Sequence, residues 1–430
     1  MPATESRNQA LLELRQKVVP HGVSQVHPVV ADKALGGKIW DVDGREYLDW
    51  VGGIGVLNVG HNHPTVVRAV REQLERFCHT CFQVTAYEPY IRLAEKLCQS
   101  APGDFEKKAF FVTTGAEATE NAIKIARAST GRSAVIAFRH SFHGRTLMGM
   151  TLTGKAQPYR QNFGPFAPEV YHAPYPYEYR GISAKAALEG LQELFDTEVS
   201  PERVAALIIE PQLGEGGFVP APTEFLRSLR ALTQKHGIVL IDDEIQTGIG
   251  RTGKFWAIEH AGIEPDLICF AKSIGGGLPI AGVLGRAEIM DAPLPGGLGG
   301  TFAGNPLACA AGLAVLEVFA EEGLLERGQR LGEILHEGFR KLQSRFPHIG
   351  DVRGLGPMAA IEIVQDPSTK EPDPVLTHRV FEAARERGLL LMKAGMYSNV
   401  IRCLVPLVVS EAEVHKGLEI LEQSFEAALG

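Results

Sequence analysis

The sequence predicts an α/β protein with a large domain built on a mostly parallel sheet and a second, smaller domain. Several apolar runs are rich in Val, Ile and Leu without alternation, which is typical of strands covered on both faces. Segments with helical spacing separate these runs, as in α/β proteins. At 430 residues with 45% hydrophobic composition, the chain is too long for one compact layer, so two domains are expected.

The N-terminal part predicts peripheral elements that lead towards a site. Residues 1–20 have the pattern of a polar amphipathic helix, and residues 40–61 predict a hairpin followed by a Gly-rich loop. Apolar residues recur at helical spacing over residues 63–77 and again over residues 88–102. Residues 107–130 then predict a strand, a glycine turn and a long helix.

Strands and helices alternate after that point, which predicts the main parallel sheet. The predicted strands are residues 133–138, 204–211, 238–244, 266–272 and 280–285. A long helix over 305–323 ends the large domain, and a linker helix over 324–346 leads to a C-terminal unit with strands near 356–364 and 399–406. The predicted divisions are an N-terminal segment 1–63, which joins the small domain and supplies a loop to the site, a large domain 64–325 and a C-terminal small domain 326–430.

Charge and hydropathy exclude several classes of protein. The net charge of −8 includes no basic stripe, so a nucleic-acid partner is not expected. The N-terminus alternates apolar and charged residues, unlike a signal or transit peptide, and no run reaches the length of a membrane span. We therefore expect a cytoplasmic protein without a membrane partner.

Cysteine and histidine usage predicts neither a disulfide framework nor a metal site. Six cysteines in 430 residues are too sparse for a disulfide scaffold. Cys78 and Cys81 form a C-x-x-C without a second pair at zinc spacing, and His61 and His63 lie in a Gly-His-Asn-His-Pro turn without nearby Cys or carboxylate groups. No metal cofactor is expected.

Two charged residues follow neighbouring apolar runs. The run IVLI ends at Asp243 and its flanking acids, and the run LICFA ends at Lys272. Ligands bind at the carboxyl ends of parallel strands, so these side chains should meet. Gly115 and Ala116 mark a strand-to-helix junction whose free N–H groups suit an anion such as phosphate. An amine, an acid and an anion site together match the needs of pyridoxal 5'-phosphate.

Longer motifs resemble the class III (subgroup II) aminotransferases, which depend on pyridoxal phosphate and have the fold type I. The resemblance covers nearly the whole chain and rests chiefly on residues 240–285, LIDDEIQTGIGRTGKFWAIEHAGIEPDLICFAKSIGGGLPIAGVLG, followed by GGLGGTFAGNPLACAAGLAVLEV. Within the family, the segments VGGIGVLNVGH, HTCFQVTAYEPY and NVIRCLVPL are most similar to bacterial 4-aminobutyrate aminotransferases.

The resemblance implies a role for particular residues. Lys272 would bind the cofactor as a Schiff base and move the substrate proton, and Asp243 would keep the pyridine nitrogen protonated. It also implies a homodimer, or a dimer of such dimers. The other implied cofactor contacts are Gly115 and Ala116 to the phosphate, Gln246 near the phenolic oxygen, Phe142 against the ring, and Thr301 to the phosphate of a neighbouring subunit.

The implied substrate residues suit a pocket that takes two kinds of carboxylic acid in turn. Arg145 would hold the distal carboxylate of both, and Arg402 the α-carboxylate of glutamate or 2-oxoglutarate alone. Glu215 would pair with Arg402 when an ω-amino acid is bound, because an unpaired buried arginine is costly. Ile54 matches an apolar position over the cofactor, where an aromatic residue would favour ornithine.

The predicted function is amino transfer from an ω-amino acid, chiefly 4-aminobutyrate, to 2-oxoglutarate by a ping-pong mechanism. Phe142 stands where the 4-aminobutyrate enzymes tend to have Tyr, and in this it resembles acetylornithine aminotransferases. The segment EPQLGEGGF also replaces the usual EPVQGEGGF. Donors left open are 5-aminovalerate, β-alanine, acetylornithine and ornithine. Two other classes are an aminomutase or racemase of the same fold and a non-catalytic cofactor-binding regulator, for which the N-terminal segment leaves little room.

Overall fold

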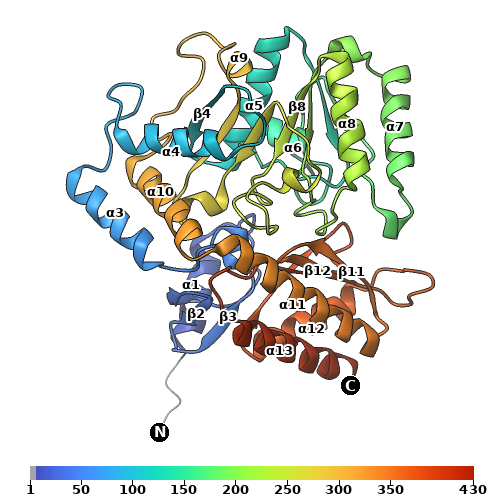
Figure 1. Cartoon of the computed structure of the whole chain (residues 1–430). Coiled ribbons are helices and arrows are strands. Elements are labelled where there is room, and N and C mark those ends of the chain that lie inside the picture. Colours follow the sequence, from blue (N-terminus) through green and yellow to red (C-terminus); the bar gives the residue numbers. More distant parts are fainter. Residues whose placement is uncertain (1–5) are drawn as a thin grey trace.

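The computed structural model describes residues 6–430, which form a large domain and a smaller domain beneath it in the view of Figure 1. The large domain is built on a seven-stranded sheet in the order β4-β10-β9-β8-β7-β5-β6. Its strands are β4 (Lys107–Val112), β5 (Ala134–Phe138), β6 (Val170–Ala173), β7 (Val204–Ile209), β8 (Val239–Asp243), β9 (Leu267–Phe270) and β10 (Ala281–Arg286).

The sheet is mostly parallel, as predicted. Strands β5 to β9 pair in parallel, while β10 runs antiparallel to both β9 and β4. All residues of β5, β7, β8 and β9 are buried, which explains why these strands are apolar runs without alternation up to the two aspartates that end β8.

Helices cover both faces of this sheet (Figure 1). Along β8, Leu240 packs into one hydrophobic cluster, whereas Val239 and Ile241 pack into the other, since successive side chains point to opposite faces. Complete burial of each such side chain contributes about 1.5–3 kcal/mol. The helices of this domain are α3 (Pro64–Arg76), α4 (Glu88–Ser100), α5 (Gly115–Thr130), α6 (Leu147–Leu152), α7 (Ala184–Thr197), α8 (Thr223–His236), α9 (Ala287–Met290) and α10 (Pro306–Glu321).

The small domain combines both ends of the described chain. One four-stranded sheet has the order β1-β2-β3-β13 and the other has the order β11-β12-β15-β14. Leu389 of β13 pairs in parallel with Leu48 of β3, so the N-terminal strands are completed by a C-terminal one. These strands are β1 (Ala31–Leu35), β2 (Lys38–Asp41), β3 (Glu46–Asp49), β11 (Ile349–Leu355), β12 (Met358–Ile363), β13 (Leu389–Leu390), β14 (Met392–Ala394) and β15 (Val400–Cys403).

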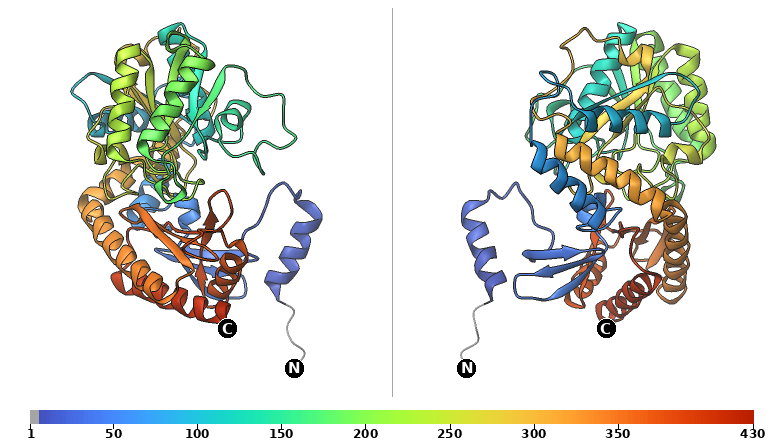
Figure 2. Two further views of the ribbon diagram at one scale, coloured as in Figure 1. Left: turned by 90° about the vertical axis from the view of Figure 1, so that its right-hand side faces the viewer. Right: turned by 60° about the vertical axis from the view of Figure 1, so that its left-hand side comes forward.

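The small-domain helices are α11 (Leu324–Arg345), α12 (Pro374–Glu386) and α13 (Glu411–Leu429), with α1 (Arg7–Val18) and α2 (Gly52–Gly55) in the N-terminal segment. The predicted hairpin is confirmed as the antiparallel pair β2 and β3. The predicted N-terminal helix is confirmed at α1, which stands apart from the body beside β1 and β2 in both views of Figure 2, and none of its residues is fully buried. Residues 1–5 of that prediction lie outside the described part of the chain.

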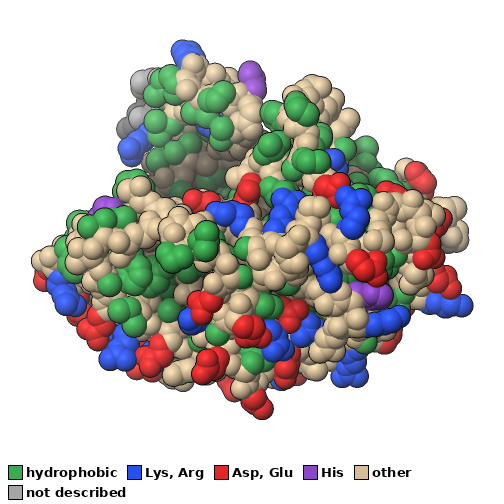
Figure 3. All heavy atoms as spheres, turned by 90° about the horizontal axis from the view of Figure 1, so that it is seen from above, with side chains coloured by type: hydrophobic (Ala, Val, Ile, Leu, Met, Phe, Trp, Pro, Cys, Tyr) green, Lys and Arg blue, Asp and Glu red, His purple; other side chains and the backbone are tan. Residues whose placement is uncertain are grey.

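The predicted domain boundaries stay a proposal. A separate hydrophobic cluster supports them, since it joins Trp50 to residues of α11, α12, α13 and the β11-β12-β15-β14 sheet. The division at 325/326 falls in the first turn of α11. No helix among residues 6–430 is long and apolar enough to cross a membrane. The face seen in Figure 3 mixes acidic and basic side chains instead of gathering basic ones.

Candidate active site

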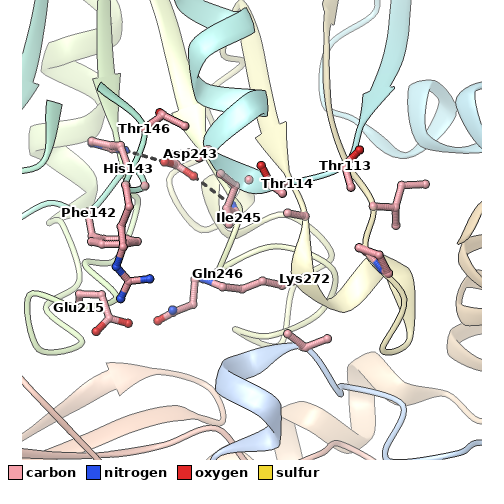
Figure 4. Close-up of a pocket in the computed structure, with 18 of the residues that line it drawn as sticks. Thr113, Thr114, Phe142, His143, Thr146, Glu215, Asp243, Ile245, Gln246 and Lys272 are labelled. Atoms are coloured by element: carbon pink, nitrogen blue, oxygen red, sulfur yellow. Dashed lines mark hydrogen bonds and ion pairs between the residues drawn. The ribbon is translucent and has the colours of Figure 1, made fainter. Parts of the chain in front are cut away.

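A cavity of about 660 Å³ opens where the carboxyl ends of β8 and β9 meet the start of α5, with α2 below it (Figure 4). A cavity at this edge of a parallel sheet follows from the topology. Most of the sequence-predicted site residues line it, although they come from segments far apart in the chain. Those residues are Gly115, Ala116, Phe142, Arg145, Glu215, Asp243, Gln246 and Lys272.

The carboxylate of Asp243 is held by two donors at the end of β8. His143 Nδ1 lies 2.6 Å from Asp243 Oδ2, and the backbone N–H of Ile245 donates to Oδ1 at 3.2 Å (Figure 4). Both side chains are almost fully buried. Because an ionised carboxylate only accepts, Nδ1 of His143 carries the proton. The carboxylate therefore has a fixed orientation towards the cavity.

Lys272 begins the 3₁₀ turn η4 (Lys272–Gly275), directly after β9, and has a left-handed backbone with φ of 50°. Burial lowers the pKa of its ammonium group, while the carboxylates of Glu215 and Asp243 act against that shift. A lowered pKa increases the fraction of neutral amine, which is the form that attacks a carbonyl carbon. The position suits a nucleophilic lysine.

The first turn of α5 provides an anion site on the cavity wall. Thr114 caps the helix: its hydroxyl accepts from the N–H of Glu117, whose carboxylate in turn accepts from the N–H groups of Thr113 and Thr114. Such a cap stabilises a helix by about 1 kcal/mol. Gly115 and Ala116, at the next two positions, have N–H groups without an intrahelical acceptor, and both line the cavity.

Glycine keeps the neighbouring loop close to this helix start. Gly144 has φ of +115°, and a Cβ atom there would lie 2.7 Å from Cβ of Ala116. A larger residue would push the loop away from the anion site. This loop also positions Phe142 and Arg145 at the cavity.

Phe142 and Arg145 line one side of the cavity, and Tyr159 packs against both. The rings of Phe142 and Tyr159 meet edge to face with centroids 4.9 Å apart. The Arg145 guanidinium carbon lies 5.6 Å from the Phe142 centroid and 5.4 Å from that of Tyr159. These contacts hold Arg145 at the cavity with its charge available.

Arg402 and Glu215 form an ion pair between the two domains. Arg402, on β15 of the small domain, is fully buried, and its Nη1 lies 2.8 Å from Glu215 Oε1 and 3.5 Å from Gln246 Oε1. Burial alone would raise the pKa of Glu215, but Arg402 reverses the shift and holds that pKa below its ordinary value. Nε and Nη2 of Arg402 have no hydrogen-bond acceptor in the described chain. The predicted pairing of these residues is present in the structure.

Three of the predicted site residues do not line the cavity formed by residues 6–430. Arg402 is fully buried and contacts Glu215. Ile54 lies in α2 with φ of 64° and is 39% exposed, and Val56, two residues later, lines the cavity instead. Thr301 is exposed in the loop between α9 and α10 and does not line this cavity.

Two titratable residues that line the cavity were not predicted from the sequence. His143 contacts Asp243 across 100 positions of sequence, and only its place between Phe142 and Arg145 hinted at a role. Glu210 follows β7 and accepts from the N–H groups of Phe142 and Gly214, both at 2.8 Å. Burial raises its pKa to about 7. Its signal was the one used for Asp243, an apolar run that ends in an acid at the same sheet edge.

The acids flanking Asp243 have a different environment. Asp242 and Glu244 are fully buried and are not among the cavity residues. Burial raises the pKa of Glu244 to about 7 and that of Asp242 well above its ordinary value. In residues 6–430, no group of three or more His, Cys, Asp or Glu side chains is placed to hold a metal ion.

The family model described as aminotransferase class-III matches residues 18–425. The chain belongs to the class III aminotransferases. This class III enzyme is 54% identical over 419 residues to the 5-aminovalerate aminotransferase DavT of Pseudomonas aeruginosa, covering 97% of this chain and 98% of that one. It is 52% identical over 421 residues to the 4-aminobutyrate aminotransferase GabT of Escherichia coli, covering 98% and 99%.

A solved transaminase from Virgibacillus superimposes with a TM-score of 0.92 at 28% identity, covering 98% of this chain and all of that one. An amine transaminase from an uncultivated Pseudomonas species, solved in its PLP-bound form, gives 0.85 at 30% identity, with 96% of each chain covered. The predicted family and the predicted transferase fold type I are therefore confirmed.

Proposed function

We propose that this class III aminotransferase moves the amino group of 4-aminobutyrate to 2-oxoglutarate in a ping-pong reaction, releasing succinic semialdehyde and glutamate. The observation that carries the proposal is that Lys272, Asp243 and the first residues of α5 line the same cavity. The likeness to the E. coli enzyme, at 52% identity, supports 4-aminobutyrate as the donor.

The residues present fit pyridoxal 5'-phosphate. Lys272 provides the amine that binds it, and Gly115 and Ala116 provide N–H donors for its phosphate. Asp243, oriented by His143, provides the carboxylate that stabilises the protonated ring nitrogen, while Phe142 offers an aromatic face. Gln246 is assigned to the phenolic oxygen. When bound, the cofactor supplies an electron sink for the substrate carbon.

Lys272 moves the proton in this proposal. Its amine takes a proton from the donor carbon and returns it at the cofactor side, as a general acid and base with a pKa lowered by burial. Asp243 has no part in that transfer: His143 Nδ1 and the Ile245 N–H each take one acceptor site of its carboxylate, and the remaining sites are assigned to the cofactor's ring nitrogen. The two residues thus have separate tasks.

Charge governs which substrates enter. Arg145 holds the distal carboxylate of either substrate, while the Glu215–Arg402 pair closes the second carboxylate site when 4-aminobutyrate is bound. Ile54 is assigned to the loop above the cofactor, where its aliphatic side chain admits a donor without an α-amino group. The 54% identical P. aeruginosa relative makes 5-aminovalerate, one methylene longer, a second candidate donor.

A homodimer completes the proposed site. Thr301 would reach the phosphate bound to a neighbouring copy, which agrees with its exposure outside its own cavity. Large apolar side chains in and near the same loop are also exposed, namely Leu294 at 83%, Phe302 at 62% and Val84 at 79%. The proposed assembly is a homodimer or a dimer of such dimers. The proposed location is the cytoplasm.

A donor panel with 2-oxoglutarate tests the proposal. Purified enzyme is expected to show a PLP absorption band and to form glutamate from 4-aminobutyrate only when 2-oxoglutarate is present. Comparison of kcat/KM for 4-aminobutyrate and 5-aminovalerate decides between the two donors. Conversion of the donor without any keto acid would instead identify an aminomutase or racemase and overturn the proposal.

A further inference from the structure

The Glu215–Arg402 pair raises the question of where the Glu215 carboxylate goes when a substrate carboxylate takes Arg402. Glu215 is nearly enclosed, with 17% of its side chain exposed. A carboxylate that loses its partner in such a place is costly unless a second cation receives it. This question rests on the proposed function, in which a dicarboxylic substrate displaces Glu215.

The cations that face Glu215 can be compared in turn. Arg402 is taken by the incoming α-carboxylate. Lys272 also faces Glu215, but its amine is committed to the cofactor and the proton. Arg145, held by Phe142 and Tyr159, binds the distal carboxylate. The remaining cation is Lys155, in the segment after α6.

Lys155 and Glu215 both form hydrogen bonds with Gly395. Its Nζ donates to the carbonyl oxygen of Gly395 at 2.9 Å, and the N–H of Gly395 donates to the backbone oxygen of Glu215 at 3.0 Å. In the described chain Lys155 has no carboxylate within ion-pair distance and no second acceptor, so two of its three N–H donors are free.

The charges of Glu215 and Arg402 both affect the pKa of Lys155. Burial lowers the pKa of the half-buried Lys155 ammonium, the Glu215 carboxylate acts against this shift, and Arg402 adds to it. Tyr159, on the same segment, also faces Glu215. An ammonium group with free donors therefore lies within electrostatic range of a carboxylate that has to move, and both residues contact Gly395.

We propose that Lys155 is the second partner of Glu215 and receives its carboxylate whenever a dicarboxylic substrate occupies Arg402. Glu215 then alternates between two cations, one in each domain. Lys155 acts as a specificity-determining residue: it stabilises the open state of the second carboxylate site and makes no contact with an ω-amino acid.

Two unreactive ligands of equal length test this, glutarate with two carboxylates and valerate with one. In the holoenzyme, Lys155→Met is expected to weaken glutarate binding about tenfold, between the effects of losing an exposed and a buried ion pair, with little change for valerate. Calorimetric titration measures both. Lys155→Arg should restore most of the glutarate affinity, and Lys185→Met, a fully exposed lysine on α7, serves as the matched control.

A double variant separates this role from direct substrate binding. In a Glu215→Gln background there is no charge to receive, so adding Lys155→Met is expected to cause no further loss of glutarate affinity. Equal losses for glutarate and valerate, or a full loss that persists with Glu215→Gln, would overturn the proposal. Failure of the wild type to transfer amino groups to 2-oxoglutarate would refute the proposed function instead, whereas the two ligands test Lys155 without turnover.

Discussion

The two sides of the cavity differ in what holds them in place. Asp243, Lys272 and the start of α5 form the cofactor side, which is fixed by the buried sheet of the large domain. Glu215 and Arg402 form the substrate side, which joins a loop of the large domain to β15 of the small domain. The first side cannot change without disturbing the sheet, whereas the second depends on one ion pair. Under the proposed function, reaction type and substrate choice are set by separate parts of the molecule.

The largest expected effect is on the cofactor side. Lys272→Ala removes both the amine that binds the cofactor and the proton carrier, so turnover should fall by at least about 10⁴-fold for every donor. Borohydride reduction followed by peptide mapping should label Lys272 in the wild type and no lysine in the variant. Lys185→Ala is the control, and a label on another wild-type lysine would contradict the assignment.

A change on the substrate side should affect one half-reaction more than the other. Arg402→Leu, combined with Glu215→Gln so that no carboxylate is left unpaired, removes the second carboxylate site. The 2-oxoglutarate half-reaction should slow about 100-fold, the scale of a charge-assisted hydrogen-bonded contact. Rapid-mixing absorbance measures each half-reaction. Equal losses in both would show that Arg402 does not discriminate between substrates.

His143 tests whether the cofactor side depends on contacts behind the cavity wall. His143→Phe removes the N–H that orients Asp243 and should lower kcat by about 10- to 100-fold for all donors alike. His143→Asn, which keeps a donor, should recover part of the loss, and His415→Phe on α13 is the control. An unchanged cofactor absorption spectrum and kcat in His143→Phe would exclude this positioning role.

The smallest expected effect concerns donor preference. Ile54→Tyr should shift the ratio of kcat/KM for 4-aminobutyrate to that for ornithine by about tenfold towards ornithine, the scale of one pocket contact. Cofactor binding and proton transfer by Lys272 should not change. If the ratio stays constant, the assignment of Ile54 is wrong, and Val56, which lines the cavity, is the next residue to test.

The cofactor side was also the more predictable one. Asp243 and Lys272 follow apolar runs, and strand topology brings such ends together, so a local pattern was sufficient. His143 was missed because its partner lies 100 positions away, and no periodicity encodes such a contact. The antiparallel direction of β10 was equally invisible, since buried strands have the same composition in either direction. Arg402 and Glu215 were paired only through the family resemblance.

The pairing of β3 with β13 has a consequence for how the protein is made. During synthesis the strands of the large sheet emerge in one continuous stretch, so the cofactor side can fold while the C-terminal part is still being translated. The pairing of β3 with β13 and the ion pair of Glu215 with Arg402 can form only after almost the whole chain has left the ribosome. Contacts between such distant segments form slowly. If Glu215 and Arg402 have the roles proposed above, selectivity for substrate is the last property that the nascent enzyme acquires.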